Sequence, residues 1–153
     1  IRIIIWNGSL PSVPPDSAKR TLVAPTSGAH LLVGYDVDLC AGDGTARVTL
    51  DVLPKHLNRN ETLHGGIIAM LLDASAGFAA SQAHGDELSP VLTVALNTQF
   101  LASARQGQVV ATGSVKRAGR SICYADAELR DVHGTLLATG NGVFKYLRKE
   151  PAA

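Results

Sequence analysis

The chain has 153 residues, of which 46% are hydrophobic and 18% charged, and its formal net charge is +1. This composition is typical of one soluble globular domain and excludes an intrinsically disordered chain. The small net charge gives no basis for binding nucleic acid or a membrane surface, and no apolar run is long enough to span a bilayer. Cys40 and Cys123 match no metal or redox spacing, so we expect buried thiols and a reducing, cytoplasmic location.

The N-terminal part of the chain is irregular in pattern. Residues 7–28 hold four of the seven prolines, together with several Ser, Thr and Gly residues. Prolines interrupt both helices and strands. We therefore predict an irregular arm over residues 1–29, a single domain over residues 30–148, and a short tail over residues 149–153.

The first regular pattern is a strict alternation of apolar and polar side chains over residues 44–53. A period of two residues predicts a half-buried strand. Residues 30–39 are expected to pair with this strand, because the glycines in residues 41–44 suit a hairpin turn.

One long helix is predicted over residues 65–83. This segment is rich in Ala, Leu, Ile and Met, contains no proline and is apolar nearly all round, so we expect other structure to enclose it. Four strands are predicted after it, at about residues 92–100, 107–117, 121–130 and 134–147. Short separators predict antiparallel pairing of neighbouring strands. The predicted fold is therefore α+β, with one long central helix wrapped by a five- or six-stranded antiparallel sheet.

An acidic residue, Asp73, lies within the apolar helix. A carboxylate at a buried position is unfavourable by several kcal/mol unless it is paired or hydrogen-bonded. Hydroxyls such as those of Ser75 or Thr93, or backbone amides, would satisfy a purely structural acid. The apolar neighbours favour a functional carboxylate instead.

The helix is predicted to begin at a pair of glycines, Gly65 and Gly66, directly after His64. The first amides of a helix have no partner within the helix, and with the helix dipole they can hold a developing oxyanion. A simple tight turn is the alternative interpretation of the same three residues.

The spacing of these two features predicts a dimer. Gly65 and Asp73 are eight residues apart, or about 12 Å along one helix. A base and an oxyanion donor that serve one carbonyl must both lie within about 3 Å of the reacting atoms. If both residues act, Gly65 of one chain must therefore meet Asp73 of a symmetry-related chain.

The string HLNRNETLHGG at residues 56–66, followed by Leu72 and Asp73, resembles the signature of hotdog-fold acyl-CoA thioesterases. It is most similar to the phenylacetic-acid-degradation (PaaI-like) branch, which also contains thioesterase superfamily member 2. The resemblance runs from about residue 30 to residue 147 and implies a hotdog fold for that domain.

The resemblance also implies roles for single residues. Asp73 matches the carboxylate that acts as general base or as nucleophile, and Gly65 matches the residue whose N–H polarises the thioester carbonyl. Asn58 matches an amide that orients the water or the thioester, and Thr93 matches a hydroxyl that holds the attacking water. His64 is expected either to bind near the thioester or to cap the helix. In the family, Asp73 and Thr93 face Asn58 and Gly65 of the partner chain.

A basic turn follows at Lys116, Arg117, Gly119, Arg120 and Ser121. It is similar to the turn that such proteins place near the phosphates of coenzyme A. Arg and Lys side chains at a glycine-containing turn suit phosphate binding, although a solvated hairpin tip has the same composition.

These features together predict hydrolysis of an aryl- or medium/long-chain acyl-CoA to free acid and coenzyme A. A hotdog hydratase or dehydratase and a non-catalytic acyl-CoA binding module are the alternatives. We expect no metal and no cofactor besides the coenzyme A of the substrate, and a homodimer that pairs further into a homotetramer. The shape of the acyl pocket is expected to depend on four apolar side chains, Ile68, Met70, Phe78 and Phe100.

Overall fold

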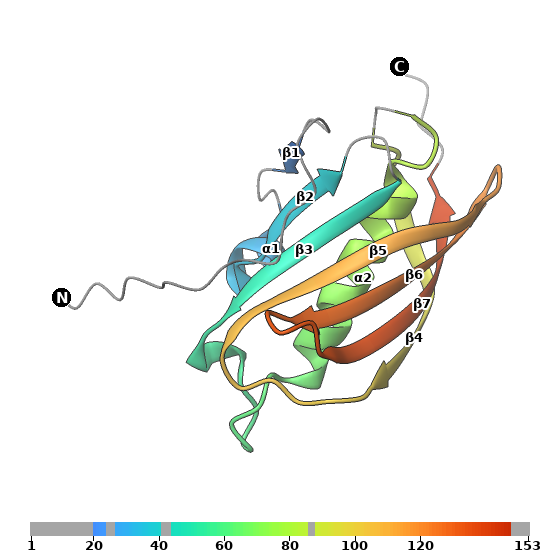
Figure 1. Cartoon of the computed structure of the whole chain (residues 1–153). Helices are drawn as coiled ribbons and strands as arrows, with labels where there is room; N and C mark the ends of the chain where they lie inside the picture. The colour runs from blue at the N-terminus through green and yellow to red at the C-terminus, as the bar shows by residue number, and fades with distance from the viewer. Residues whose placement is uncertain (1–19, 24–26, 41–43, 86–87, 148–153) are drawn as a thin grey trace.

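A seven-stranded antiparallel sheet with one long helix across its face forms the domain (Figure 1). The computed structural model describes residues 20–23, 27–40, 44–85 and 88–147. In chain order the elements are β1 (Arg20–Val23), α1 (Gly28–Val33), β2 (Asp36–Cys40), β3 (Thr45–Val52), the 3-10 helix η1 (Pro54–His56), α2 (Gly65–Ser81), β4 (Val91–Phe100), β5 (Gly107–Ala118), β6 (Ile122–Asp131) and β7 (Leu136–Tyr146). The predicted α+β arrangement is confirmed.

The sheet has the strand order β1-β2-β3-β5-β6-β7-β4, so it contains one strand more than the upper expectation of six. The additional strand is β1, which pairs with β2 from Arg20↔Cys40 to Val23↔Val37. This strand lies in a stretch that was expected to be irregular. Its own sequence shows no strand pattern, and backbone pairing with β2 stabilises the strand instead. Residues 1–19 and 24–26 of the predicted arm and the predicted tail lie outside the described residues, while residues 27–29 form the start of α1.

The short helix α1 replaces the beginning of the first predicted strand. The Ser27 side chain accepts a hydrogen bond from the His30 N–H and caps the helix at its start. Gly34 ends the helix in the left-handed conformation, with φ of 80°. Such caps at both ends limit the helix to six residues, so the strand begins only at Asp36.

The predicted hairpin is confirmed by the pairing of β2 with β3. Its register runs from Asp36↔Thr49 to Cys40↔Thr45. The alternation on β3 is also confirmed, because Ala46, Val48 and Leu50 are all buried. Cys123 on β6 is buried and free, as expected, whereas the side chain of Cys40 lies outside the described residues.

Helix α2 begins and ends close to the predicted residues. One side packs on the sheet through buried residues, namely Ile68, Leu71, Leu72, Ser75, Ala76, Ala79 and Ala80. The opposite side is only partly covered within one chain, so the expected enclosure on all sides is wrong for the single chain. In the described part of the chain, no helix is both long and apolar enough to cross a membrane.

The helix lies unusually close to the middle of the sheet at Gly113 on β5. A Cβ atom at this position would stand 2.1 Å from the backbone oxygen of Ser75. Only a glycine fits such an approach of two backbones. Gly113 therefore sets the depth at which the middle of α2, including Asp73, rests on the sheet.

Strand β4 pairs with β7 and not with β5, which corrects the expectation that all neighbouring strands pair. Its register runs from Val91↔Tyr146 to Phe100↔Ala138, and β5 pairs with β3 instead. The linker between β4 and β5 must cross three strand spacings, or about 14 Å. Six extended residues reach about 20 Å, so even a short linker allows this crossing.

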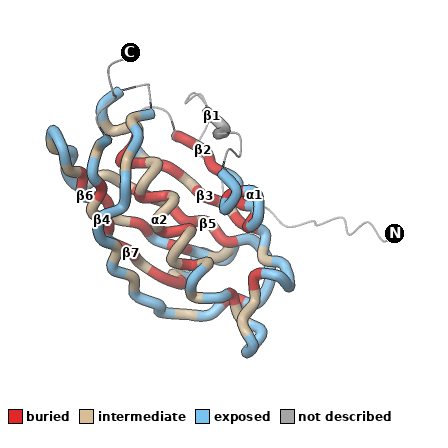
Figure 2. The backbone as a smooth tube through the Cα atoms, turned by 180° about the vertical axis from the view of Figure 1, so that it is seen from behind, coloured by how far each residue is buried: buried red, intermediate tan, exposed pale blue. Residues whose placement is uncertain are grey.

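At the free edge of the sheet, β4 is exposed along most of its length (Figure 2). Leu92 and Val94 are 54% and 60% exposed. An edge strand with apolar side chains and unpaired backbone groups is a ready template for another strand.

Candidate active site

The Asp73 carboxylate lies half-buried in the middle of α2 and faces β4. The Thr93 hydroxyl donates a hydrogen bond to its Oδ1 over 2.8 Å. Among the described residues, Oδ2 has no hydrogen-bond partner. Burial raises the pKa of the Asp73 carboxyl above its ordinary value of 3.8, and the Thr93 hydrogen bond partly opposes that shift. The pair therefore offers a free carboxylate oxygen of increased basicity.

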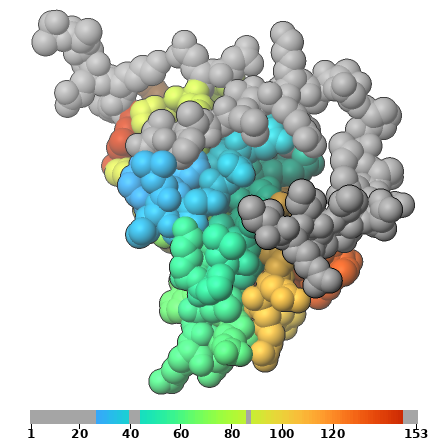
Figure 3. All heavy atoms as spheres, turned by 90° about the vertical axis from the view of Figure 1, so that its left-hand side faces the viewer, coloured from blue at the N-terminus to red at the C-terminus, as the bar shows by residue number. Residues whose placement is uncertain are grey.

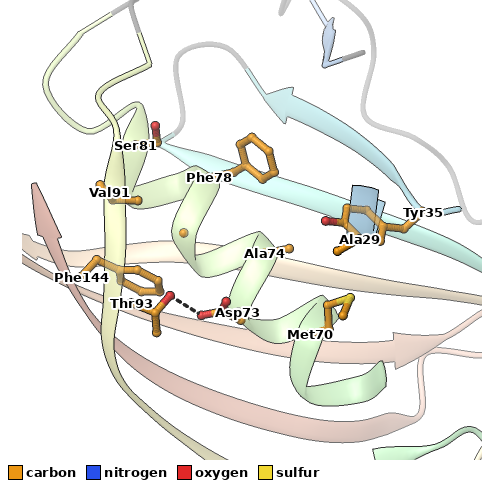
Figure 4. A pocket seen from close by; sticks show the side chains of 11 residues that line it. Ala29, Tyr35, Met70, Asp73, Ala74, Phe78, Ser81, Val91, Thr93 and Phe144 are labelled. Carbon is orange, nitrogen blue, oxygen red and sulfur yellow. Dashed lines mark hydrogen bonds between the residues drawn. The ribbon is translucent and has the colours of Figure 1, made fainter. Parts of the chain in front are cut away.

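Asp73 and Thr93 form one wall of a pocket of about 470 Å³ (Figure 4). The size falls within the range of about 300–1,000 Å³ that is usual for small-molecule sites. Most of the lining is apolar and includes Met70, Ala74, Phe78, Val91 and Phe144. A carboxylate with a raised pKa at the wall of an apolar pocket is a typical arrangement for a catalytic base.

The four side chains that were expected to shape this pocket have different positions. Met70 and Phe78 line it, as predicted. Ile68 is only 4% exposed and belongs to the core beneath the helix. Phe100 contacts Gly65 instead, because its ring atom Cε1 lies 3.5 Å from the place of a Gly65 Cβ.

The N-terminus of α2 presents one free backbone donor. His64 is the N-cap of the helix, and its Nδ1 accepts a hydrogen bond from the Gly66 N–H over 2.9 Å. Its backbone oxygen accepts from the N–H groups of Ile67 and Ile68. The Gly65 N–H has no hydrogen-bond partner among the described residues. The capping geometry therefore leaves Gly65 as the available donor at the positive end of the helix dipole.

No described residue of the same chain requires a glycine at position 65. An added Cβ there would make an ordinary contact with Phe100, and no closer one. By contrast, a Cβ at Gly66 would stand 3.1 Å from Nδ1 of His64, so Gly66 protects the helix cap.

Asn58 lies in the loop that precedes α2, where its side chain stabilises the loop itself. Its Oδ1 accepts from the N–H groups of Asn60 and Thr62 over 2.8 and 3.2 Å, and its Nδ2 donates to Oγ1 of Thr62. Figure 3 shows this loop next to α1 on one face of the molecule. Lys55 and His56 hold the two segments together through hydrogen bonds to the carbonyls of Leu32 and Val33.

One chain therefore places the predicted site residues in two separate groups. Asp73 and Thr93 meet at the pocket, whereas Gly65 and Asn58 do not line it. Because α2 is one continuous helix from Gly65 to Ser81, the rise of about 12 Å between Gly65 and Asp73 is a fixed separation.

The basic turn joins β5 to β6 near the C-terminal end of α2. His84, just after the helix, contacts the backbone oxygen of Gly119 over 3.2 Å. Arg117 and Arg120 are exposed, while Lys116 forms an ion pair with Asp126 over 3.3 Å. The turn does not line the pocket. Its two arginines are exposed, so they are accessible to a phosphate group.

Tyr35 is a pocket residue that the sequence analysis did not identify. Its ring stacks on His30 with centroids 4.2 Å apart, and its hydroxyl points into the pocket (Figure 4). Burial, followed by the negative charge of Asp73, raises the pKa of the Tyr35 hydroxyl above 10.0. The alternation of Tyr35 with Val37 and Leu39, which face the core, is the signal that would have placed this side chain inside.

The chain is similar to known thioesterases and esterases. The sequence profile of the thioesterase superfamily matches residues 60–138. A Halobacterium salinarum protein that is named as an esterase is 32% identical over 120 residues, which are 72% of this chain and 79% of that protein. Acyl-coenzyme A thioesterase 13 of Mus musculus is 28% identical over 93 residues, which are 60% of this chain and 65% of that protein. The solved structure of zebra fish thioesterase superfamily member 2 has a TM-score of 0.69 at 26% identity, covering 80% of this chain and 88% of that one.

Proposed function

The chain belongs to the thioesterase superfamily, and we propose that it hydrolyses acyl-CoA thioesters at a site that two copies of the chain build together. The observation that carries this proposal is the Asp73 carboxylate, which is held by Thr93 at the wall of an apolar pocket. The name of the mouse relative supports coenzyme A as the thiol of the substrate.

The reaction requires a base and an oxyanion donor. The Asp73 carboxylate takes a proton from a water molecule while the water oxygen attacks the carbonyl carbon of the thioester. The Gly65 N–H of the second copy stabilises the negative charge on the carbonyl oxygen. The C–S bond then breaks, and coenzyme A leaves as a thiolate while the free acid remains. Direct attack by Asp73, through a mixed anhydride that water hydrolyses, would use the same groups.

The position of β4 supports a shared site. Thr93, near one end of β4, contacts Asp73, and Phe100, at the other end, packs on Gly65. If two β4 strands pair antiparallel about a two-fold axis, the Thr93 end of one lies beside the Phe100 end of the other. Such pairing brings Asp73 of one copy towards Gly65 of the second copy, and it also covers the exposed apolar edge.

The remaining predicted site residues take supporting roles in this proposal. Asn58 of the second copy reaches the thioester with the Nδ2 hydrogen that Thr62 does not use. His64 acts through its cap, which directs the Gly65 N–H outwards; direct contact with substrate stays a prediction. Arg117 and Arg120 bind the phosphates of coenzyme A. The pairing of dimers into tetramers also stays a prediction.

The acyl group occupies the apolar pocket. Its aromatic and thioether side chains suit an aryl or a medium- to long-chain acyl group, while the amide-rich arm of coenzyme A would leave its polar groups unpaired there. Phenylacetyl-CoA is accordingly one member of the set to be tested, not an assigned substrate.

A hydrolysis screen tests the proposal. The wild type and Asp73→Asn are compared on aryl-, short- and long-chain acyl-CoAs by following thiol release. We expect at least one substrate to be hydrolysed, with a loss of roughly 100-fold or more in Asp73→Asn. Asp51→Asn, which changes an exposed carboxylate on β3, is the matched control and should retain activity.

Three results would overturn the proposal. Undiminished hydrolysis in Asp73→Asn would exclude Asp73 as the base or nucleophile. Tight binding of acyl-CoAs without thiol release by the wild type would favour a binding module, and hydration of an enoyl-CoA without thiol release would favour a hydratase.

A further inference from the structure

Tyr35 lines the same pocket as Asp73. This side chain is only 9% exposed, and its hydroxyl makes no hydrogen bond with any described residue. It projects from the segment between α1 and β2, while Asp73 and Thr93 approach from α2 and β4 (Figure 4). The hydroxyl group itself opens into the cavity, where a ligand can reach it.

The other polar side chains of the pocket already have partners. Thr93 donates to Asp73, and the Ser81 hydroxyl donates to the backbone oxygen of Ser89 over 2.6 Å. The Tyr35 hydroxyl is therefore the remaining unpaired side-chain donor in the described lining. The side chains around this hydroxyl are mostly apolar and offer few competing hydrogen-bonding groups. A ligand oxygen that accepts its proton would therefore form a stronger hydrogen bond than it would in water.

The position of the hydroxyl is rigidly defined. The Tyr35 ring stacks on His30 with an interplanar angle of 7°. The His30 ring also contacts the Tyr35 backbone oxygen through Nε2 over 2.6 Å. A donor that is held by stacking and by the backbone loses little conformational entropy when it binds a ligand.

We propose that Tyr35 is a specificity-determining residue of the acyl pocket and that its hydroxyl binds a neutral oxygen substituent on the acyl group. The inference rests on the proposed function. The substituent is a hydroxyl or keto oxygen at a distance from the thioester, because the thioester itself lies at Asp73, on another wall of the pocket.

The charge of the pocket selects against acidic substituents. The Tyr35 hydroxyl stays protonated at neutral pH, because burial and the nearby Asp73 carboxylate raise its pKa. It therefore offers a proton to a neutral oxygen. An acyl group with a terminal carboxylate would bring a second negative charge into the pocket of Asp73, which is unfavourable because like charges repel.

Kinetics on matched substrates test the proposal. The pairs are octanoyl-CoA with 8-hydroxyoctanoyl-CoA, and phenylacetyl-CoA with 4-hydroxyphenylacetyl-CoA. For each pair the ratio of kcat/KM, hydroxylated over unsubstituted, is measured in the wild type, in Tyr35→Phe and in Tyr124→Phe. Tyr124→Phe removes the same atom from an exposed tyrosine on β6, outside the pocket lining.

We expect the ratio to fall roughly tenfold in Tyr35→Phe for at least one pair, and to stay unchanged in Tyr124→Phe. Equal ratios in the wild type and Tyr35→Phe for both pairs would refute the role of Tyr35. The thermal midpoint of Tyr35→Phe, which keeps the stacked ring, shows whether the variant is folded.

A binding experiment separates this inference from the proposed function. Thioether analogues of the same four substrates carry a CH2 group between the sulfur and the carbonyl carbon, so they cannot be hydrolysed, and their Kd values are compared by calorimetry. If the wild type hydrolyses none of the thioesters, the proposed function fails, but a hydroxyl preference in Kd that Tyr35→Phe removes still supports the Tyr35 contact. If the wild type shows no preference for the hydroxylated compounds in either kcat/KM or Kd, the proposed Tyr35 contact is overturned.

Discussion

The Thr93 hydroxyl donates a 2.8 Å hydrogen bond to Oδ1 of Asp73, and this bond joins the edge strand β4 to the middle of α2. It leaves the second carboxylate oxygen without a partner among the described residues. Thr93 therefore orients the carboxylate and also moderates its basicity, since burial raises the pKa of Asp73 and the hydrogen bond lowers it.

Thr93→Val is expected to move the pH profile of hydrolysis to higher pH. Without the hydroxyl, burial alone acts on Asp73, so its pKa rises further. A general base is active only when deprotonated, and the acidic limb of kcat/KM must shift in the same direction. Thr93→Ser retains the hydroxyl and should retain the wild-type profile. An unshifted limb in Thr93→Val would contradict the assigned contact.

Asp73→Asn is expected to stabilise the folded protein at neutral pH. Because the folded pKa of Asp73 is raised, the folded state holds its proton to higher pH than the unfolded state, whose pKa is near 3.8. The stability of the wild type therefore falls as the pH rises through this window, and the fall is complete above the folded pKa. The amide side chain of the Asp73→Asn variant does not titrate, so the variant does not lose this stability as the pH rises.

Thermal midpoints at fixed protein concentration measure this effect. The thermal midpoint of Asp73→Asn should exceed that of the wild type most at neutral pH, and this difference should disappear below pH 3.8. An advantage that does not change with pH would mean that the charge of Asp73 is not its cause.

Gly65→Pro is expected to abolish hydrolysis, whereas Gly65→Ala is not. Proline removes the N–H that would bind the oxyanion, and it is well tolerated at the first position of a helix. His64, with φ of −63° and ψ of 132°, already has the extended conformation that precedes a proline. We expect kcat to fall roughly 100-fold or more in Gly65→Pro. Circular dichroism checks that the helix remains.

Mixing two inactive variants tests whether the site is shared. In a dimer of one Asp73→Asn chain and one Gly65→Pro chain, one site combines the intact Asp73 and the intact Gly65. Random reassociation should therefore restore about a quarter of the wild-type activity, as the isologous geometry of a two-fold dimer requires. No recovery after verified subunit exchange would place both groups in the same chain.

Arg120→Ala is expected to weaken the binding of coenzyme A esters selectively. The side chain is exposed and available for a phosphate, so KM should rise roughly fivefold, equivalent to about 1 kcal/mol. The matching acyl-pantetheine has no phosphate, and its KM should not change. Lys116→Ala should have a smaller effect, because Lys116 is paired with Asp126. Equal effects on both substrates would exclude a phosphate contact.

Gly113→Ala is expected to destabilise the fold by about 3 kcal/mol or more, because its Cβ would collide with the backbone of Ser75. Gly28→Ala is the matched control. No atom of the described residues lies within 4 Å of the place of its Cβ, so the stability of this variant should change by at most about 1 kcal/mol. Denaturant unfolding of both variants measures the difference.

The elements with strong local patterns were predictable. The alternation on β3 and the long apolar run of α2 both appear in the structure near the expected residues. The chain position of β4 was also predictable, but its partner was not. A strand pattern shows which side chains face the core, whereas the choice of β7 over β5 depends on contacts between residues far apart in sequence.

The same division applies to the candidate site. Asp73 stood out because an acid in an apolar helix is energetically unusual, and its distance from Gly65 followed from the rise of a helix. These are properties of one segment, so the sequence by itself determined them. The pairing of Asp73 with Thr93 and the position of Tyr35 in the same pocket join residues from different elements. Only the tertiary structure decided them, because packing against the sheet brings distant side chains to within hydrogen-bonding range.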